Sequence, residues 1–98
     1  MENYNSVLLD GALACDPIEG VSEKGTPTAN FALLINVNTV AGNYCDTAPV
    51  KVISNNLVTK CMDLLKEDAQ VRVVGRLAIT DIDWCIVADH IEIKHLQL

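Results

Sequence analysis

The sequence predicts an all-β barrel of five strands in Greek-key order, with one α-helix between the third and fourth strands. Segments in which apolar residues alternate with other residues recur along the chain, which is typical of strands. Two of these segments contain an internal glycine, Gly11 and Gly75, and such glycines often mark a bulge or the tight bend of a barrel strand. A single segment, residues 57–65, repeats its apolar residues with helical spacing.

The first two strands are expected at residues 7–14 and 28–38. The first strand places three apolar residues on one face and ends at Asp16-Pro17, because proline has no N–H to donate to a ladder. In the second strand apolar residues, Phe31 among them, alternate with a more polar set rich in asparagine, which predicts a half-buried antiparallel strand with one wet face. The polar residues 22–27 are expected to form the turn between the two strands.

The remaining elements complete a recognisable order. Residues 41–46 are expected to form a hairpin loop and residues 50–53 a short third strand, and Asn55 or Asn56 is expected to cap the helix that follows. The fourth and fifth strands are expected at residues 71–79 and 84–93. This order, with two strands coiled by glycines, is that of the five-stranded OB barrel. An α+β sandwich with the same order of elements is the alternative.

Length and charge limit the function. The 98 residues form one expected domain, and no apolar run approaches the roughly 20 residues that a membrane span needs. The first residues lack the basic and apolar regions of a secretory signal, so a cytoplasmic location is expected. Thirteen Asp and Glu oppose seven Lys and Arg, which gives a net charge of −6. Such a charge disfavours a polyanion unless a local basic patch survives.

Catalysis and metal binding have little support. The cysteines are Cys15, Cys45, Cys61 and Cys85, and no C-x-x-C pair indicates a zinc or redox site. Reduced, packed thiols are expected in a cytosolic chain. No nucleophile motif or phosphate-binding loop is present. We therefore expect a non-enzymatic protein with no metal and no cofactor.

Four stretches resemble the bacterial single-stranded-DNA-binding (SSB) protein family. In chain order they are "NSVLLDGALACDP", "TANFALLINV", "CMDLLKEDAQVRVVGRL" and "CIVADHIEI", which together extend over about residues 5 to 93. They are similar to the family's first strand, second strand, helix with fourth strand, and last strand. The chain would be a diverged or short member, close in size to primosomal relatives. The resemblance implies an OB fold and assembly into homodimers or tetramers, often through the first strand.

The resemblance also implies how DNA is held. In this family aromatic rings stack on unpaired bases, at roughly 1–3 kcal/mol per base, and basic side chains follow the backbone. Carried over to this chain, the stacking positions lack aromatic residues: they fall at Val40, near Ala48, near Ser54 and near Ile82. The loss of several stacks removes most of a micromolar affinity.

Five other residues are the candidates for DNA binding: Trp84, Tyr44, Lys51, Arg72 and Arg76. For the aromatic pair the alternatives are a half-buried or interface tryptophan and a tyrosine in a mobile loop. For the arginines the alternative is cross-strand pairing with Asp or Glu. Two functions follow. One is single-stranded DNA binding in replication, recombination or repair, with replication proteins as possible partners. The other is an OB-fold interaction module that has lost or weakened DNA binding.

Overall fold

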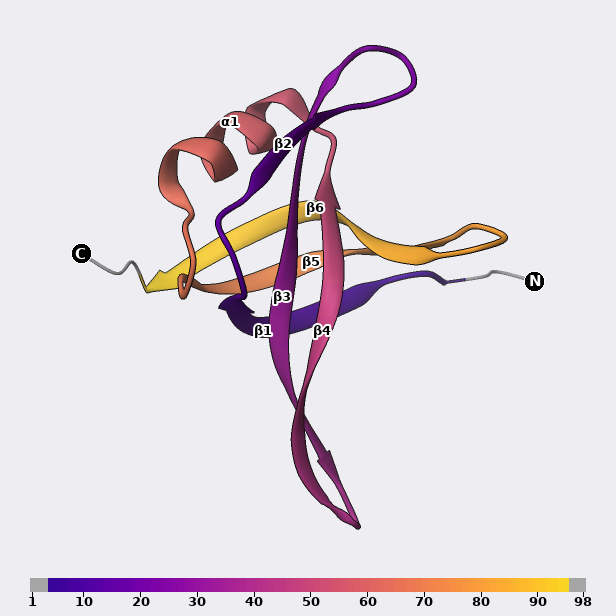
Figure 1. Ribbon diagram of the computed structural model, residues 1–98, viewed down its shortest axis with the longest axis vertical. Coiled ribbons are helices and arrows are strands. Elements are labelled where there is room, and N and C mark those ends of the chain that lie inside the picture. The colour runs from indigo at the N-terminus through magenta and orange to yellow at the C-terminus, as the bar shows by residue number, and fades with distance from the viewer. Residues whose placement is uncertain (1–3, 96–98) are drawn as a thin grey trace.

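The computed structural model describes residues 4–95 and builds them into six strands and one helix. Figure 1 shows two long curved strand pairs that cross, with the helix over one end of the crossing. In chain order the elements are β1 (Val7–Leu13), β2 (Ile18–Val21), β3 (Pro27–Thr39), β4 (Gly42–Val52), α1 (Asn55–Leu64), β5 (Gln70–Ile79) and β6 (Trp84–His95). Among the described residues, no helix is long and apolar enough to cross a membrane.

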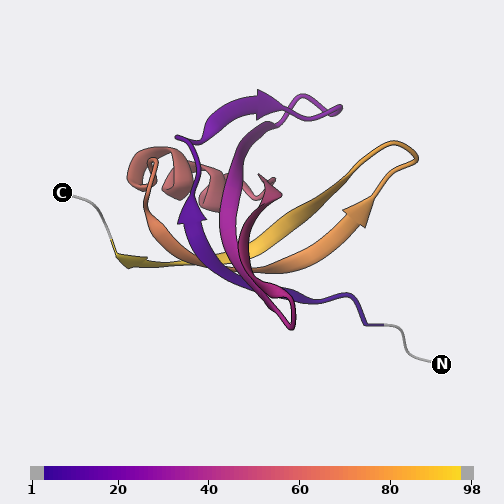
Figure 2. The same ribbon diagram turned by 60° about the horizontal axis from the view of Figure 1, so that its bottom comes forward.

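The sheet closes into a barrel. Its strand order is β1-β5-β6-β4-β3-β2, and a further pairing of β1 with β3 joins the two sides. The β4–β6 pair is parallel and the other pairs are antiparallel. Because β2 pairs with β3 alone, the closed barrel has five strands and β2 lies at its rim (Figure 2). This architecture, all-β and closed with one helix, is that of the predicted OB barrel.

The predicted position of the helix, between the third and fourth strands, is wrong. The helix follows the fourth strand, β4, because residues 18–21 form a short strand that was not expected. This strand is four residues long and its exposed side chains do not alternate, so periodicity could not reveal it. It is held through backbone pairing, from Ile18 with Asn30 to Val21 with Pro27.

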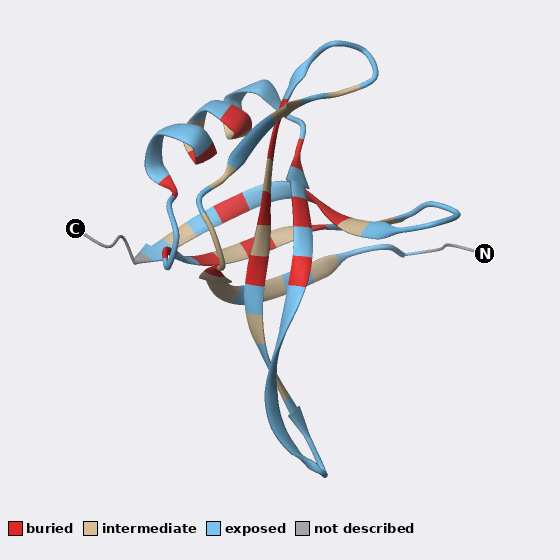
Figure 3. Ribbon diagram, in the orientation of Figure 1, coloured by how far each residue is buried: buried red, intermediate tan, exposed pale blue. Residues whose placement is uncertain are grey.

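The core lies inside the barrel, and Figure 3 shows buried residues alternating with more exposed ones along β3 and β4 where they cross the barrel. The alternation predicted for residues 28–38 is present, and Phe31 is buried as expected. The largest fully buried side chains come from five strands and the helix: Leu13, Leu33, Val52, Cys61, Val71, Val73 and Ile91.

The helix covers one end of the barrel. It buries Val58 and Cys61, and Leu65 just beyond its end is also buried. Leu64, expected on the buried face, is instead 45% exposed. The predicted asparagine cap is also wrong: α1 begins at Asn55, so the cap position is Ser54, whose side chain makes no capping hydrogen bond.

Gly11 and Gly75 lie where the barrel backbone comes closest to itself. At Gly11, β1 passes from pairing with β5 to pairing with β3, and a Cβ there would overlap the Leu34 carbonyl. At Gly75 the β5–β6 register shifts, and a Cβ would overlap the Val87 carbonyl. The irregularity predicted at Gly75 is therefore present, and at Gly11 the strand changes its pairing partner.

Strands β3 and β4 continue past the barrel as a two-stranded arm (Figure 1). The pairing runs without a break from Ala29–Val52 to Thr39–Gly42, with the turn at Val40 and Ala41. The loop predicted at residues 41–46 is therefore wrong. Tyr44 lies on a strand and pairs with Val37 rather than sitting in a loop.

Candidate nucleic-acid interface

Lys51 stands in the middle of a row that crosses four strands on the outside of the barrel. It pairs with Asn30 of β3 on one side and Val87 of β6 on the other, and Val87 pairs in turn with Arg76 of β5. Paired residues project from the same face of a sheet, and neighbouring strands are about 4.8 Å apart. The Cα atoms of Lys51 and Arg76 are therefore about 10 Å apart on one surface.

A second row runs parallel to the first and is small and apolar. Ala32 pairs with Pro49, and Cys85 pairs with Ala78. Val50 of β4 pairs with Ile86 of β6, and these two strands are parallel. Pro49 and Cys85 each come one residue before that pair, so Pro49 and Cys85 lie side by side. The outer face of the barrel thus carries an apolar row beside a row that contains two cationic side chains.

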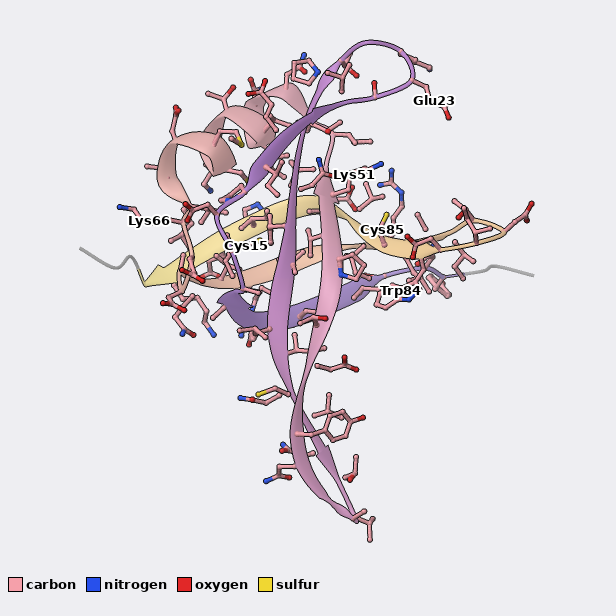
Figure 4. All side chains as sticks on the ribbon, viewed as in Figure 1. Cys15, Glu23, Lys51, Lys66, Trp84 and Cys85 are labelled. Carbon is pink, nitrogen blue, oxygen red and sulfur yellow. The ribbon has the colours of Figure 1, made fainter. Side chains whose placement is uncertain are left out.

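Surface grooves meet at Lys51. One, of about 300 Å³, runs over Ile18, Ala32 and Pro49 between Cys15 and Cys85. A second, of about 240 Å³, runs from Pro49 to the β5–β6 hairpin and Trp84, and a third, of about 440 Å³, lies against the loop of residues 22–26. Lys51 lines all three. Figure 4 shows Cys15 and Cys85 on either side of the β3–β4 pair, with Lys51 near its upper end.

Most basic side chains are already engaged within the protein. Arg72 donates two hydrogen bonds to Asp10, from Nε at 2.8 Å and from Nη2 at 3.0 Å, and Lys94 lies 3.4 Å from the same carboxylate. The contacts with Arg72 and Lys94 lower the pKa of Asp10 from 3.8 to about 2, and the hydrogen bonding from Arg72 is the largest cause. Arg76 pairs with Asp89 at 2.8 Å. The cross-strand pairing considered for both arginines is therefore present.

Lys51 differs because it has no such partner. Within residues 4–95, Lys51, Lys24 and Lys66 form no hydrogen bond through their ammonium groups and no ion pair. Lys24 belongs to the loop beside the third groove, whereas Lys66 lies at the far end of the helix (Figure 4). The charge that a phosphate could meet on this face is therefore concentrated at Lys51.

The two aromatic candidates project from the other face of their strands. Tyr44 is four residues from the buried Ala48, and Trp84 is two residues from the buried Ile86, so each aromatic residue is on the same face of its strand as a core residue. Because successive side chains alternate, both point away from the face that carries Lys51. Figure 4 shows Trp84 and Cys85 on opposite sides of β6. Trp84, 44% exposed, still lines the edge of the second groove, whereas Tyr44 lies out on the arm.

The positions carried over from the resemblance have varied surroundings. Ala48 is buried, Val40 lies in the turn of the arm, and Ser54 precedes the helix. Ile82, in the β5–β6 turn, is 95% exposed.

Sequence reasoning missed Pro49, Ala32 and Ile18. Alternation was the available signal: if Lys51 faces outward, Pro49 must as well, and Ala48 must face the core.

The thiols form no metal site. Among the described residues, no three His, Cys, Asp or Glu side chains are grouped so that they could hold a metal ion. All four cysteines are free thiols. Burial raises the pKa of Cys61 to about 11, so it is an inert member of the core.

Comparison with known proteins places the fold. No protein-family model matches the sequence, and no curated protein sequence matches it significantly. Solved structures do match. The small single-stranded DNA-binding protein of Streptomyces coelicolor superposes with a TM-score of 0.79 at 21% identity, over 96% of both chains.

The single-stranded DNA binding protein of Thermus aquaticus gives a TM-score of 0.77 at 21% identity, over 97% of this chain and 42% of the other. A deletion mutant of that protein gives 0.75 at 20% identity, over 97% and 43%. The chain thus spans less than half the length of the Thermus protein. At this identity the likeness shows that the chain has the fold of these proteins, as the sequence resemblance predicted.

Proposed function

We propose that the protein binds single-stranded DNA on the outer face of β3 and β4, without catalysis, as a diverged, short relative of the bacterial SSB proteins. The observation that carries the proposal is Lys51, which is unpaired among the described residues and lies at the junction of three surface grooves. This face lies between the loops at residues 22–26 and 80–83, and OB folds bind oligonucleotides on the corresponding face and loops. Structures with this fold that are single-stranded DNA-binding proteins support it.

The candidate residues contribute unequally in this proposal. Lys51 contacts a phosphate, and Arg76, in the same row, joins it if Asp89 is displaced. Trp84 offers its ring at the edge of the second groove. Arg72, bound to Asp10, and Tyr44, on the arm, are the least supported of the five. Few phosphates are neutralised, so we expect weak binding.

The biological setting is part of the same proposal. We place the activity in the cytoplasm, in replication, recombination or repair, with replication proteins as further partners. Assembly into homodimers or tetramers is supported by β1: residues 7–10 pair with β5 along one edge, and β1 pairs with β3 only at Ala12 and Leu13. The other edge of residues 7–10 has no strand partner within the described part of the chain, and an open edge can pair with another chain.

A titration of labelled oligo-dT, followed by fluorescence anisotropy, tests the proposal. We expect binding at about 20 mM salt that weakens as salt rises, since counterions are released from phosphates. Lys51→Glu should weaken binding about tenfold or more, because it reverses the one unpaired charge at the centre of the face. Lys66→Glu is the matched control, because it makes the same change of charge at an unpaired lysine far from the grooves.

Absence of binding at low salt, or an equal loss in both variants, would contradict the proposal. A protein-interaction module is then the second candidate. The β5–β6 hairpin favours it, because Ile79 and Ile82 are exposed there beside Asp81 and Asp83, with no basic residue between positions 77 and 88. An exposed apolar tip with acidic neighbours fits a protein pocket with a basic rim.

A further inference from the structure

We propose that this protein holds a nucleobase in the apolar groove of Ile18, Ala32 and Pro49, where the one aromatic lining residue, Phe31, is buried in the core. The inference rests on the proposed function and adds to it a base-binding site with named residues. It assigns base binding to residues other than the two aromatic candidates, Trp84 and Tyr44.

The groove has the chemistry of a base site. It holds about 300 Å³, enough for one ring system, and it passes across the β3–β4 pair between Cys15 and Cys85. Its walls are carbon-rich: the Ile18 side chain from β2, the Ala32 methyl group from β3 and the Pro49 ring from β4. Ligand sites combine such apolar walls with a few polar groups that fix orientation.

The polar groups at its rim fit a nucleotide. Lys51 is two residues along β4 from Pro49, so its Cα is about 6.7 Å away on the same face. That separation is similar to the distance between a base and its own phosphate. Asn30, which pairs with Lys51, donates its Nδ2 hydrogens toward Thr28 Oγ1 at 3.1 Å and the Ile18 carbonyl at 3.4 Å. Because these bonds engage the donor side of the amide, the Asn30 oxygen is the atom that would accept a hydrogen bond from a base N–H.

An unpaired single strand is therefore favoured over other occupants. A duplex buries its bases in the stack, so it cannot place one against Pro49. An apolar peptide would leave the Lys51 ammonium without a counter-charge, whereas a nucleotide supplies both the flat apolar ring and the anion. Among the described residues, the unpaired cations on this face are Lys51, which lines this groove, and Lys24, which lines the neighbouring third groove, so only about one or two phosphates are neutralised.

Two consequences can be measured. Affinity should depend on the presence of bases more than on the number of phosphates. The slope of log K against log salt should be shallow, about −0.7 to −1.4, which is the value for one or two phosphate contacts on a single strand. A protein that followed the backbone with many cations would show a much steeper slope.

The closing experiment compares oligo-dT with an abasic oligonucleotide of the same length and charge, using the wild-type protein. We expect the abasic strand to bind at least about tenfold more weakly. Pro49→Asp should cause a similar loss on oligo-dT. Thr47→Asp adds the same charge on the same face of β4 outside the 300 Å³ groove, and should cost less than about threefold.

Each outcome bears on a different claim. Equal binding of abasic and normal strands, or equal losses from Pro49→Asp and Thr47→Asp, overturns the base site while single-stranded DNA binding stands. No binding of oligo-dT at low salt overturns the proposed function itself. Thermal unfolding of both aspartate variants shows whether a loss of binding reflects the groove or a failure to fold.

Discussion

At the scale of single residues, pairing decides which charges are available. Three basic side chains are held by carboxylates, and Lys60 donates to the Ile91 carbonyl at 3.1 Å. A count of lysines and arginines therefore overstates what the surface offers to a phosphate. Within residues 4–95, Lys51 is the strand cation on the candidate face whose ammonium group forms no hydrogen bond and no ion pair.

The Asp10–Arg72 pair gives a prediction about acid stability. The pKa of Asp10 in the folded protein, about 2, lies below its ordinary value of 3.8, so folding favours the carboxylate. Its stabilising contribution is full above about pH 4 and is lost as the pH falls toward 2. We expect Asp10→Asn to lower the melting temperature at neutral pH, and the difference from wild type to shrink below about pH 4. Thermal unfolding followed by circular dichroism at a series of pH values measures it.

A difference in melting temperature that stays constant from neutral pH to pH 2 would contradict this assignment. Arg76 and Asp89 provide the control, since Asp89→Asn breaks an equally short but singly bonded surface pair. Exposed single pairs contribute little to stability, so Asp89→Asn should have the smaller effect at neutral pH.

At the scale of elements, long strands with a strict two-residue period could be predicted, and short or polar strands could not. β3 was found because its core side chains alternate with asparagines over many residues. The outer half of β4 was taken for a loop because Asn43 and Asp46 are typical of turns. In the structure these residues pair with β3 across a tight turn, and that backbone pairing outweighs their local preference.

The candidate site was predicted only in part for the same reason. Lys51 could be chosen from the sequence because it is the single charge in the predicted strand of residues 50–53. Pro49 could not, because the carried-over stacking position fell near Ala48, one residue away. A shift of one residue moves a side chain to the other face of a strand, here from the solvent to the core. The register of β4 against β3 and β6 settles which face each residue occupies.

Gly75 gives a prediction at this scale. The β5–β6 register shifts there, and an alanine Cβ would overlap the backbone carbonyl of Val87 and crowd the Ala88 backbone. Backbone cannot move aside as a side chain does, so we expect Gly75→Ala to lower the free energy of unfolding by about 3 kcal/mol or more. Urea unfolding measures it.

Gly20→Ala is the control for this substitution. Its Cβ would meet only side-chain ends, Thr28 Oγ1 at 3.0 Å and Asn30 Nδ2 at 3.1 Å. We expect a loss of less than about 1 kcal/mol there, since these groups can shift. If the two variants were equally stable, the close approach at Gly75 would not be what requires a glycine.

At the scale of the whole molecule, barrel closure leaves part of β1 with an open edge. β3, β4, β5 and β6 pair on both sides over part of their lengths, whereas residues 7–10 of β1 pair with β5 alone among the described residues. Leu8 lies on this segment and is 60% exposed. Proteins usually shield an open, apolar strand edge with charge or with a partner, and β1 carries only Asp10 there. A second copy of the chain is the partner that the resemblance to SSB proteins implies.

The oligomeric state tests this reading. We expect the wild-type protein to elute as a dimer or larger assembly, with its mass measured by light scattering after size exclusion. Leu8→Glu should shift it toward the monomer, because a symmetric contact through β1 brings the two new carboxylates together. Val21→Glu, at another exposed apolar strand position, should leave the mass unchanged. A monomeric wild-type protein at tens of micromolar would contradict assembly through β1, and an equal effect of both substitutions would mean that apolar exposure in general, rather than this edge, drives association.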